Sequence, residues 1–268
     1  MKNNGFKIGL LVLAVAAVGY TVFATMNTKE APETEETNQT SLPESENKAE
    51  VVNKVKEANE EKEVVKPIVS APKKEALIDN KVPFTSQAPT GNWDDERQQD
   101  GCEEASALMA VYWAQGKSLS SSIALEKILG ASDYALEKHG EFRDISAEDT
   151  VQWIFKEYFK YDKVSVKKDV SIQDIITELE KGNIIVIPAN GQKLDNPYFS
   201  PPGPERHMLV VRGYDRAKKQ FITNDPGTKR GAAFRYNETV LYNAILSYET
   251  GHHEPVTRTE KDIIVVSK

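Results

Sequence analysis

The feature that most constrains the fold of this chain is the uneven distribution of its aromatic residues. Residues 27–75 contain no Phe, Trp or Tyr and carry 12 acidic against 8 basic side chains. Such a segment buries too little apolar surface to offset the entropy lost on ordering, so we expect a disordered acidic linker there. Folding is thereby confined to residues 76–268, whose 193 residues suffice for one well-packed domain.

The first 26 residues have a different character. Lys2 and Lys7 precede a run of 19 uncharged residues, from Ile8 to Met26. As a helix, this run would span about 28 Å, close to the hydrocarbon thickness of a bilayer. We expect residues 1–26 to form an N-terminal membrane anchor, and a signal peptide cleaved after Ala24 is the alternative. Positive charge before the span predicts an extracytoplasmic domain at the cell membrane, or a secreted one after cleavage.

Within residues 76–268, helical patterns come first and β-branched runs follow. After the extended piece "KVPFTSQAP" and the loop "TGNWDDERQQDG", apolar spacing predicts helices from Cys102, near Ser120–Leu129, from Ser146 and from Ser171. The expected strands are "KVSVKK", "NIIVIPAN", "HMLVVRGYD", "QFITND" and "DIIVVSK". This order predicts an α+β domain with a helical half and a sheet half.

Cys102 is the only cysteine in the chain, which excludes an internal disulfide and a multi-cysteine zinc site. It opens an expected helix, where unpaired backbone N–H groups and the helix dipole stabilise a thiolate and can donate to an oxyanion. Glu103 and Glu104 oppose the thiolate through like charge, so an additional cation is required. On local sequence, Cys102 is either a reactive thiol or a buried small hydrophobe.

The four histidines differ in context. His252 and His253 stand in the polar turn "TGHHEPV", which favours a solvated loop over a metal site. His139 lies in the hydrophilic connector "EKHGEF". His207 follows a proline-rich loop and opens the apolar strand "HMLVVRGY", where it either caps the sheet or acts as a base.

Asp225 ends the next strand, in "FITNDPG". Two antiparallel strands joined by "DRAKKQ" would bring His207 and Asp225 to the same end of the sheet. Taken alone, Asp225 reads as the first residue of an Asp-Pro-Gly turn. The joint occurrence of a cysteine at a helix start, a histidine opening a strand and an aspartate ending its neighbour favours thiol nucleophilic catalysis.

These segments resemble a known family. In this order, "VPFTSQAP", "GNWDD", "CEEASALMA", "HMLVVRGYD" and "NDPG" are similar to the C39-like cysteine peptidase group, a branch of the papain-like fold, over residues 82–268. The resemblance implies an α+β architecture in which N-terminal helices, including the helix bearing the nucleophile, pack against a C-terminal antiparallel sheet. It implies no metal or organic cofactor.

The resemblance also implies residue roles. Cys102 corresponds to the nucleophile, His207 to the general base and acid, and Asp225 to the residue that orients the imidazole, with Asn224 as its substitute. The implied activity is hydrolysis of peptide or isopeptide bonds through an acyl-enzyme.

Gln87, in "SQ", corresponds to the glutamine that supports the oxyanion through its side-chain amide, an apt donor because an amide does not titrate. The fifteen residues from Gln87 to Cys102 exceed the spacing in transporter-fused members, so Gln98 and Gln99 stay open as alternatives.

The expected partner is a peptide or protein outside the cytoplasm, bound by a monomer. No "GxxxxGK[ST]" occurs in the chain, which separates it from the transporter-fused members that cleave leader peptides after paired glycines. A net charge of −7 gives no electrostatic case for nucleic acid. Two other functions stay open: a cell-wall peptidoglycan amidase or endopeptidase, and a non-catalytic, membrane-tethered binding module. Trp93, Tyr198 and Phe199 either line the cleft or pack in the core.

Overall fold

The structure is a computed structural model that describes residues 75–268. The anchor expected at residues 1–26 and the linker expected at residues 27–75 lie outside this range, apart from residue 75. Within residues 75–268, no helix combines the length and the apolarity needed to cross a bilayer.

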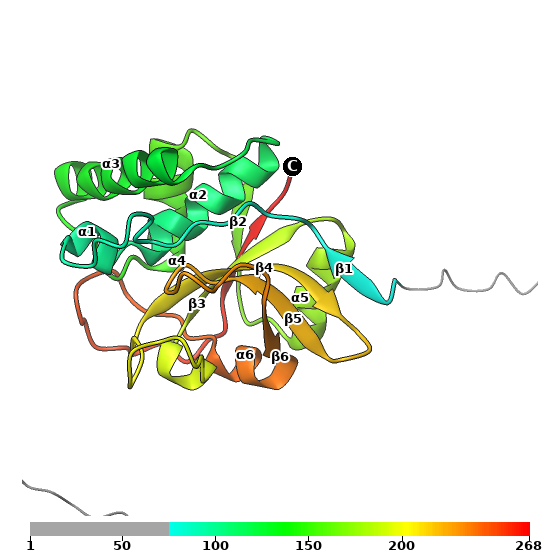
Figure 1. The fold of residues 1–268 in the computed structure, drawn as a ribbon. Helices are drawn as coiled ribbons and strands as arrows, with labels where there is room; N and C mark the ends of the chain where they lie inside the picture. The colour runs from blue at the N-terminus through cyan, green and yellow to red at the C-terminus, as the bar shows by residue number, and fades with distance from the viewer. Residues whose placement is uncertain (1–74) are drawn as a thin grey trace, which may run out of the picture. The chain divides into compact units, whose positions relative to one another are not determined.

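A seven-stranded antiparallel sheet forms the centre of this part of the chain (Figure 1). Its strands are β1 (Leu77–Asp79), β2 (Val164–Lys167), β3 (Ile184–Ala189), β4 (His207–Asp215), β5 (Gln220–Asn224), β6 (Phe234–Asn237) and β7 (Ile263–Val266). The order across the sheet is β2-β7-β3-β4-β5-β6, and β1 pairs with the far end of β4. β4 is therefore a central strand, bonded to β3 on one side and β5 on the other.

Helices cover both faces of the sheet. They are α1 (Glu96–Gln99), α2 (Cys102–Ala114), α3 (Ser121–His139), α4 (Ala147–Asp149), α5 (Ile172–Glu180) and α6 (Glu238–Ala244), with a π-helical stretch, η1 (Thr150–Tyr158), and a 3-10 helix, η2 (Gly191–Leu194). In Figure 1, α2 and α3 lie above the sheet while α5 and α6 lie below it.

Alternation along β4 divides the apolar interior into two cores. Met208 and Val210 face the core shared with α2, α3 and η1, while Leu209 and Val211 face the core shared with α5 and α6. A central strand buried on both faces explains why the sequence "HMLVVRGYD" is almost continuously apolar. These two layers confirm the expected α+β class, with a helix that begins at Cys102 packed on an antiparallel sheet.

Local signals predicted most elements, and the differences have physical causes. The helix expected near Ser120–Leu129 continues to His139, because Ala131 and Ala135 are buried in the core shared with η1. Gly130 allows a close approach by Tyr158, since a Cβ there would lie 2.4 Å from the phenol oxygen. The helix then ends at Gly140, which adopts the left-handed conformation. The extended piece "KVPFTSQAP" belongs to no strand, and β1, β6, α6 and the short α1, which lies in the expected loop, were not predicted.

Candidate active site

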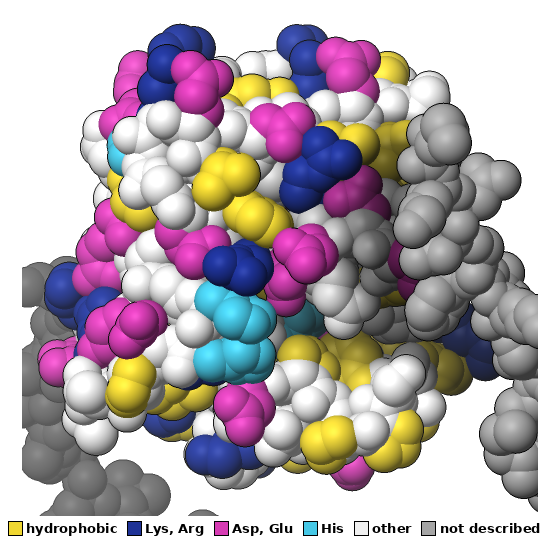
Figure 2. Space-filling model, turned by 90° about the vertical axis from the view of Figure 1, so that its left-hand side faces the viewer, with side chains coloured by type: hydrophobic (Ala, Val, Ile, Leu, Met, Phe, Trp, Pro, Cys, Tyr) yellow, Lys and Arg dark blue, Asp and Glu magenta, His cyan; other side chains and the backbone are white. Residues whose placement is uncertain are grey.

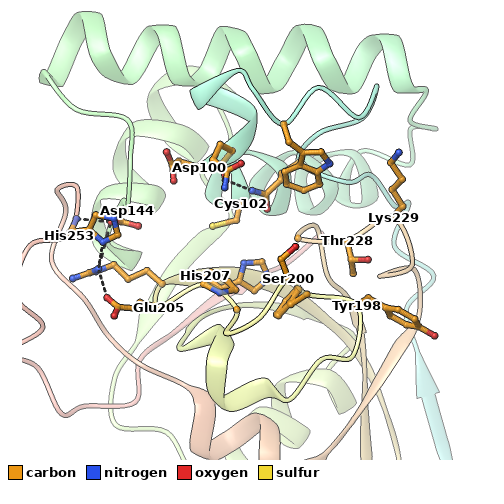
Figure 3. A pocket seen from close by; sticks show the side chains of 18 of the residues that line it. Asp100, Cys102, Asp144, Tyr198, Ser200, Glu205, His207, Thr228, Lys229 and His253 are labelled. Atoms are coloured by element: carbon orange, nitrogen blue, oxygen red, sulfur yellow. Dashed lines mark hydrogen bonds and ion pairs between the residues drawn. The ribbon is translucent and has the colours of Figure 1, made fainter. Parts of the chain in front are cut away.

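Cys102 begins α2 at the end of the sheet that carries the start of β4. Gly101 precedes it as the helix N-cap and offers no side chain to the first turn. The helix is tied to β4 by Ser106, whose hydroxyl donates to the backbone carbonyl of Met208 at 3.1 Å. This bond, together with the packing of α2 on the sheet, brings the thiol of Cys102 over the residue before Met208, which is His207 (Figure 3).

His207 and Asp225 form a buried hydrogen-bonded pair. The distance from His207 Nε2 to Asp225 Oδ1 is 2.8 Å, and the two side chains are 2% and 0% exposed. The second carboxylate oxygen, Oδ2, accepts hydrogen bonds from the Tyr236 hydroxyl at 2.6 Å and the Asn196 amide at 3.2 Å. The backbone N–H of Gly227 donates to Oδ1 at 3.0 Å. Because Nε2 faces the carboxylate, Nδ1 is the nitrogen of His207 left for other chemistry.

Asn224 lies on the other side of the sheet from this pair. It pairs with Val210 across β4 and β5, so strand alternation turns it toward the α2 face and Asp225 toward the opposite one. Its amide donates to the backbone carbonyls of Val82 and Pro83 at 3.0 and 3.1 Å. Asn224 therefore holds the N-terminal segment against the sheet, and its hydrogen bonds do not reach His207.

Gln87 lines the same cleft as Cys102 and His207. Its side-chain nitrogen donates to the backbone carbonyls of Gln98 at 3.1 Å and Gln99 at 2.7 Å, while its Oε1 is buried without a hydrogen-bond partner. In this conformation both amide protons are engaged at the end of α1. Of the two alternatives, the exposed Gln99 lines the cleft and the buried Gln98 does not.

The cleft has a volume of about 840 Å³ and opens between α2, the loop before β4 and the loop after β5. Figure 2 shows a face on which histidine side chains lie beside acidic and basic ones. The three aromatic candidates all line the cleft: Trp93, Tyr198 and Phe199. The ring of Phe199 meets the imidazole of His207 edge to face, with the ring centroids 5.3 Å apart. Both rings also crowd Gly227, where a Cβ would lie 2.9 Å from a carbon atom of each.

The thiol itself is held by a neighbouring carboxylate. Cys102 Sγ donates to Glu103 Oε2 at 3.1 Å, and the other oxygen of Glu103 accepts from the Tyr248 hydroxyl at 2.8 Å. All three side chains are buried, with Glu103 only 1% exposed. Within residues 75–268, the hydrogen-bond partner of the thiol is thus Glu103 and not His207.

This surrounding opposes ionisation of the thiol. Burial, followed by the charge of Glu103, raises the pKa of Cys102 well above its usual value. Burial, followed by the charge of Asp144, raises the pKa of Glu103 to about 7, against the hydrogen bonds from Cys102 and Tyr248. Burial and the charge of Glu103 likewise raise the pKa of Glu104, which accepts from Ser132 at 3.1 Å. The helix-start position therefore does not by itself produce a thiolate.

The pKa of Asp225 is shifted in the opposite direction, downward. Burial by itself would raise its pKa, but the charge of His207 and the hydrogen bonds from His207, Tyr236 and Gly227 outweigh burial. The pKa of Asp225 therefore lies below its usual value, and the carboxyl is ionised beside the imidazole. Neither Tyr236 nor Asn196 stands in a motif that the sequence suggested, because each reaches Asp225 from a separate loop or strand.

His252 and His253 lie at one end of the cleft, in a loop that two side chains hold. The Asp144 carboxylate accepts from the backbone N–H of His253 at 2.9 Å, and the guanidinium of Arg206 donates to the carbonyl of Glu254. Among the described residues, no group of three or more His, Cys, Asp or Glu side chains is arranged to hold a metal ion. His139 lies elsewhere, stacked on Trp153 at 4.2 Å.

The sequence profile of the Peptidase C39 like family matches residues 79–252, which is more than half of the chain. No curated protein matches the chain in sequence. Among solved structures, one described as a C39-like peptidase from Bacillus anthracis is similar to this chain, with 17% identity and a TM-score of 0.46. The match covers 73% of this chain and 98% of the other.

Proposed function

This chain belongs to the peptidase C39-like family, and we propose that it is a thiol-dependent peptidase that uses Cys102, His207 and Asp225. The observation that supports these roles best is the buried pair of His207 and Asp225, 2.8 Å apart, on the same cleft as the thiol. A cysteine nucleophile needs a base within reach and a third group that orients that base. The hydrogen bonds from Tyr236, Asn196 and Gly227 hold the Asp225 carboxylate in place for this purpose.

The proposed reaction begins with a rotation of the thiol away from Glu103 and toward His207 Nδ1. The imidazole takes the thiol proton, and the sulfur attacks the carbonyl carbon of the scissile amide. His207 then gives the proton to the leaving amine as the C–N bond breaks, which leaves a thioester on Cys102. Water, activated by His207, hydrolyses the thioester and restores the thiol. Asp225 orients the imidazole and balances its charge while it is protonated.

The oxyanion of each tetrahedral intermediate requires hydrogen-bond donors. The backbone N–H of Cys102, at the start of α2, is one proposed donor. Gln87 is the other, provided that its amide turns from the carbonyls of Gln98 and Gln99 toward the cleft when substrate binds. Such a turn breaks the two hydrogen bonds that Nε2 donates to these carbonyls and none at Oε1, so the new bonds to the oxyanion have to replace them.

The location and the substrate are also proposals. The uncharged run at residues 8–26 supports an N-terminal anchor with the peptidase domain outside the cytoplasm. A peptidase there acts on a peptide or protein outside the cytoplasm. We propose a monomer, with the long segment at residues 27–75 as a spacer between anchor and domain.

The test compares the full-length chain with the variants Cys102→Ala, His207→Ala and His139→Ala. His139 is the matched control, since it is a histidine that contacts Glu157 and Trp153 outside the cleft. We expect His207→Ala to lower the cleavage of a peptide library about 100-fold or more, because general acid-base catalysis is lost. His139→Ala should leave cleavage unchanged.

Three results would change the assignment. Cleavage that survives Cys102→Ala contradicts the thiol mechanism. Solubilisation of purified wall material, without cleavage of linear peptides, favours the peptidoglycan amidase. A tethered binding module is favoured if no substrate is cleaved and if iodoacetamide alkylates Cys102 at the same rate in the parent chain and in His207→Ala.

A further inference from the structure

We propose that Lys229 and Arg230 form an anion subsite at one end of the cleft, which binds a carboxylate of the peptide substrate near the scissile bond. The inference rests on the proposed peptidase function, since it assigns a substrate class to the same cleft. Both residues line the cleft, and both are exposed to solvent.

The loop that carries the two cations is fastened to the residue that orients the imidazole. The backbone N–H of Asp225 donates to the carbonyl of Gly231 at 3.0 Å, and the N–H of Gly227 donates to the Asp225 side chain at 3.0 Å. The N–H of Arg230 donates to the hydroxyl of Thr228 at 3.2 Å. These bonds hold the loop in a fixed place relative to His207, so a ligand held there is also positioned for the chemistry.

No carboxylate in the described part of the chain neutralises the two cations. Among the described residues, neither Lys229 nor Arg230 has an ion-pair partner; the guanidinium of Arg230 lies over the ring of Tyr198, 4.9 Å from its centroid. Lys229 Nζ lies against the turn at Gly91, 2.9 Å from the position that a Cβ there would take. An arginine placed over an aromatic ring keeps its edge N–H groups free, and these match the geometry of a carboxylate.

The opposite end of the cleft carries the opposite charge. Asp100, Asp144 and Glu205 line it, and in Figure 3 they lie across Cys102 and His207 from Lys229. Arg206, which is 6% exposed, lies 3.9 Å from Asp144 and 3.7 Å from Glu205 and also contacts the 252–254 loop. The carboxylates at this end still outnumber the one arginine that lines it, three to one.

A substrate carboxylate is therefore attracted at one end and repelled at the other. Charge of both signs in one cleft selects the register of a bound peptide as well as its composition. The carboxylate has two possible sources, an Asp or Glu side chain or the free C-terminus of a short peptide. Both sources present the same group to Lys229 and Arg230, and the peptide pools described below distinguish one source from the other.

The first arm measures cleavage of fluorogenic peptide pools by the full-length chain. The pools differ in one residue, Glu or Gln, at each position in turn, and each is made with a C-terminal acid or amide. We expect kcat/KM to favour the Glu or the acid form about tenfold, since a hydrogen bond to a charged group is gained. High salt and the variant Lys229→Gln/Arg230→Gln should abolish the preference.

The matched control is Lys117→Gln/Lys218→Gln, which removes the same charge from two exposed residues that do not line the cleft. It should retain the preference. A preference for Glu alone identifies a side chain as the source, and a preference for the acid form alone identifies the C-terminus. Equal cleavage of all pools by the unmodified chain overturns the subsite and leaves the peptidase function standing.

The second arm needs no turnover. Iodoacetate and iodoacetamide alkylate Cys102 with the same leaving group but differ in charge, so their rate ratio reports the local field. We expect Lys229→Gln/Arg230→Gln to lower the ratio severalfold and the control to leave it unchanged. A lowered ratio without any peptide cleavage keeps the subsite and rejects the peptidase function. If the thiol reacts with neither reagent, equal binding of the Glu and Gln pools to the Cys102→Ala chain overturns the subsite.

Discussion

Replacing Glu103 by Gln should release the thiol of Cys102. The carboxylate oxygen lies 3.1 Å from the sulfur, and its charge is the second cause, after burial, that raises the pKa of Cys102. Two like charges at about 4 Å repel by about 4 kcal/mol at an effective dielectric constant of about 20. A factor of ten requires only about 1.4 kcal/mol. We therefore expect iodoacetamide to alkylate Glu103→Gln at least about tenfold faster at pH 8, where Glu103 is largely ionised.

The same substitution should stabilise the fold at high pH. The pKa of Glu103 is about 7 in the folded chain against 4.5 for the free carboxyl, so the folded chain holds this proton more tightly than the unfolded chain. The free energy of unfolding consequently falls as pH rises from 4.5 to 7, by about 3 kcal/mol from this group. Glu103→Gln removes that fall, which urea unfolding at pH 5 and pH 8 measures.

Glu104→Gln is the control that separates the two effects. Glu104 is equally buried, but its hydrogen bond comes from Ser132 and not from the thiol. Its raised pKa predicts the same kind of stabilisation at pH 8 with a smaller change in alkylation. Alkylation that is slower in Glu103→Gln than in the parent chain, or equal in rate, would refute the role given to this carboxylate.

Three further predictions concern the sheet end. Asp225→Asn should lower kcat about 100-fold or more with little change in KM, because the imidazole loses its oriented, charged partner; steady-state kinetics that show only a KM effect contradict this. Tyr236→Phe removes a 2.6 Å bond to the ionised Asp225 and should cost about 1.5–3 kcal/mol. Since the pKa of Asp225 is lowered by folding, that loss should be visible in urea unfolding at pH 7 and shrink as pH falls through the acid range. Asn224→Ala should cost about 1–3 kcal/mol, because the carbonyl of Pro83 loses its side-chain donor and that of Val82 keeps only Arg212, and should leave the Cys102 alkylation rate unchanged; slower alkylation of the folded variant would contradict a purely structural role.

Local patterns in the sequence predicted the elements that carry the site. The 3.6-residue spacing after Cys102 and the β-branched run after His207 each determine an element from neighbouring residues alone. The order of helices before strands predicted the α+β class for the same reason. Patterns failed where distant packing decides, as in the extension of α3 past Gly130, where Ala131 and Ala135 are buried in the core shared with η1.

The sequence alone determined which residue types stand at the cleft: one thiol at a helix start, one histidine at a strand start and a carboxylate at the end of the next strand. Only the tertiary structure shows that Asp225, and not Asn224, is hydrogen-bonded to His207, because strand register sends adjacent side chains to opposite faces. It also shows that Glu103 contacts the thiol and that neither Lys229 nor Arg230 pairs with a carboxylate of residues 75–268. Burial and charge pairing depend on groups far apart in the chain, so they arise only when the sheet and the helices pack together.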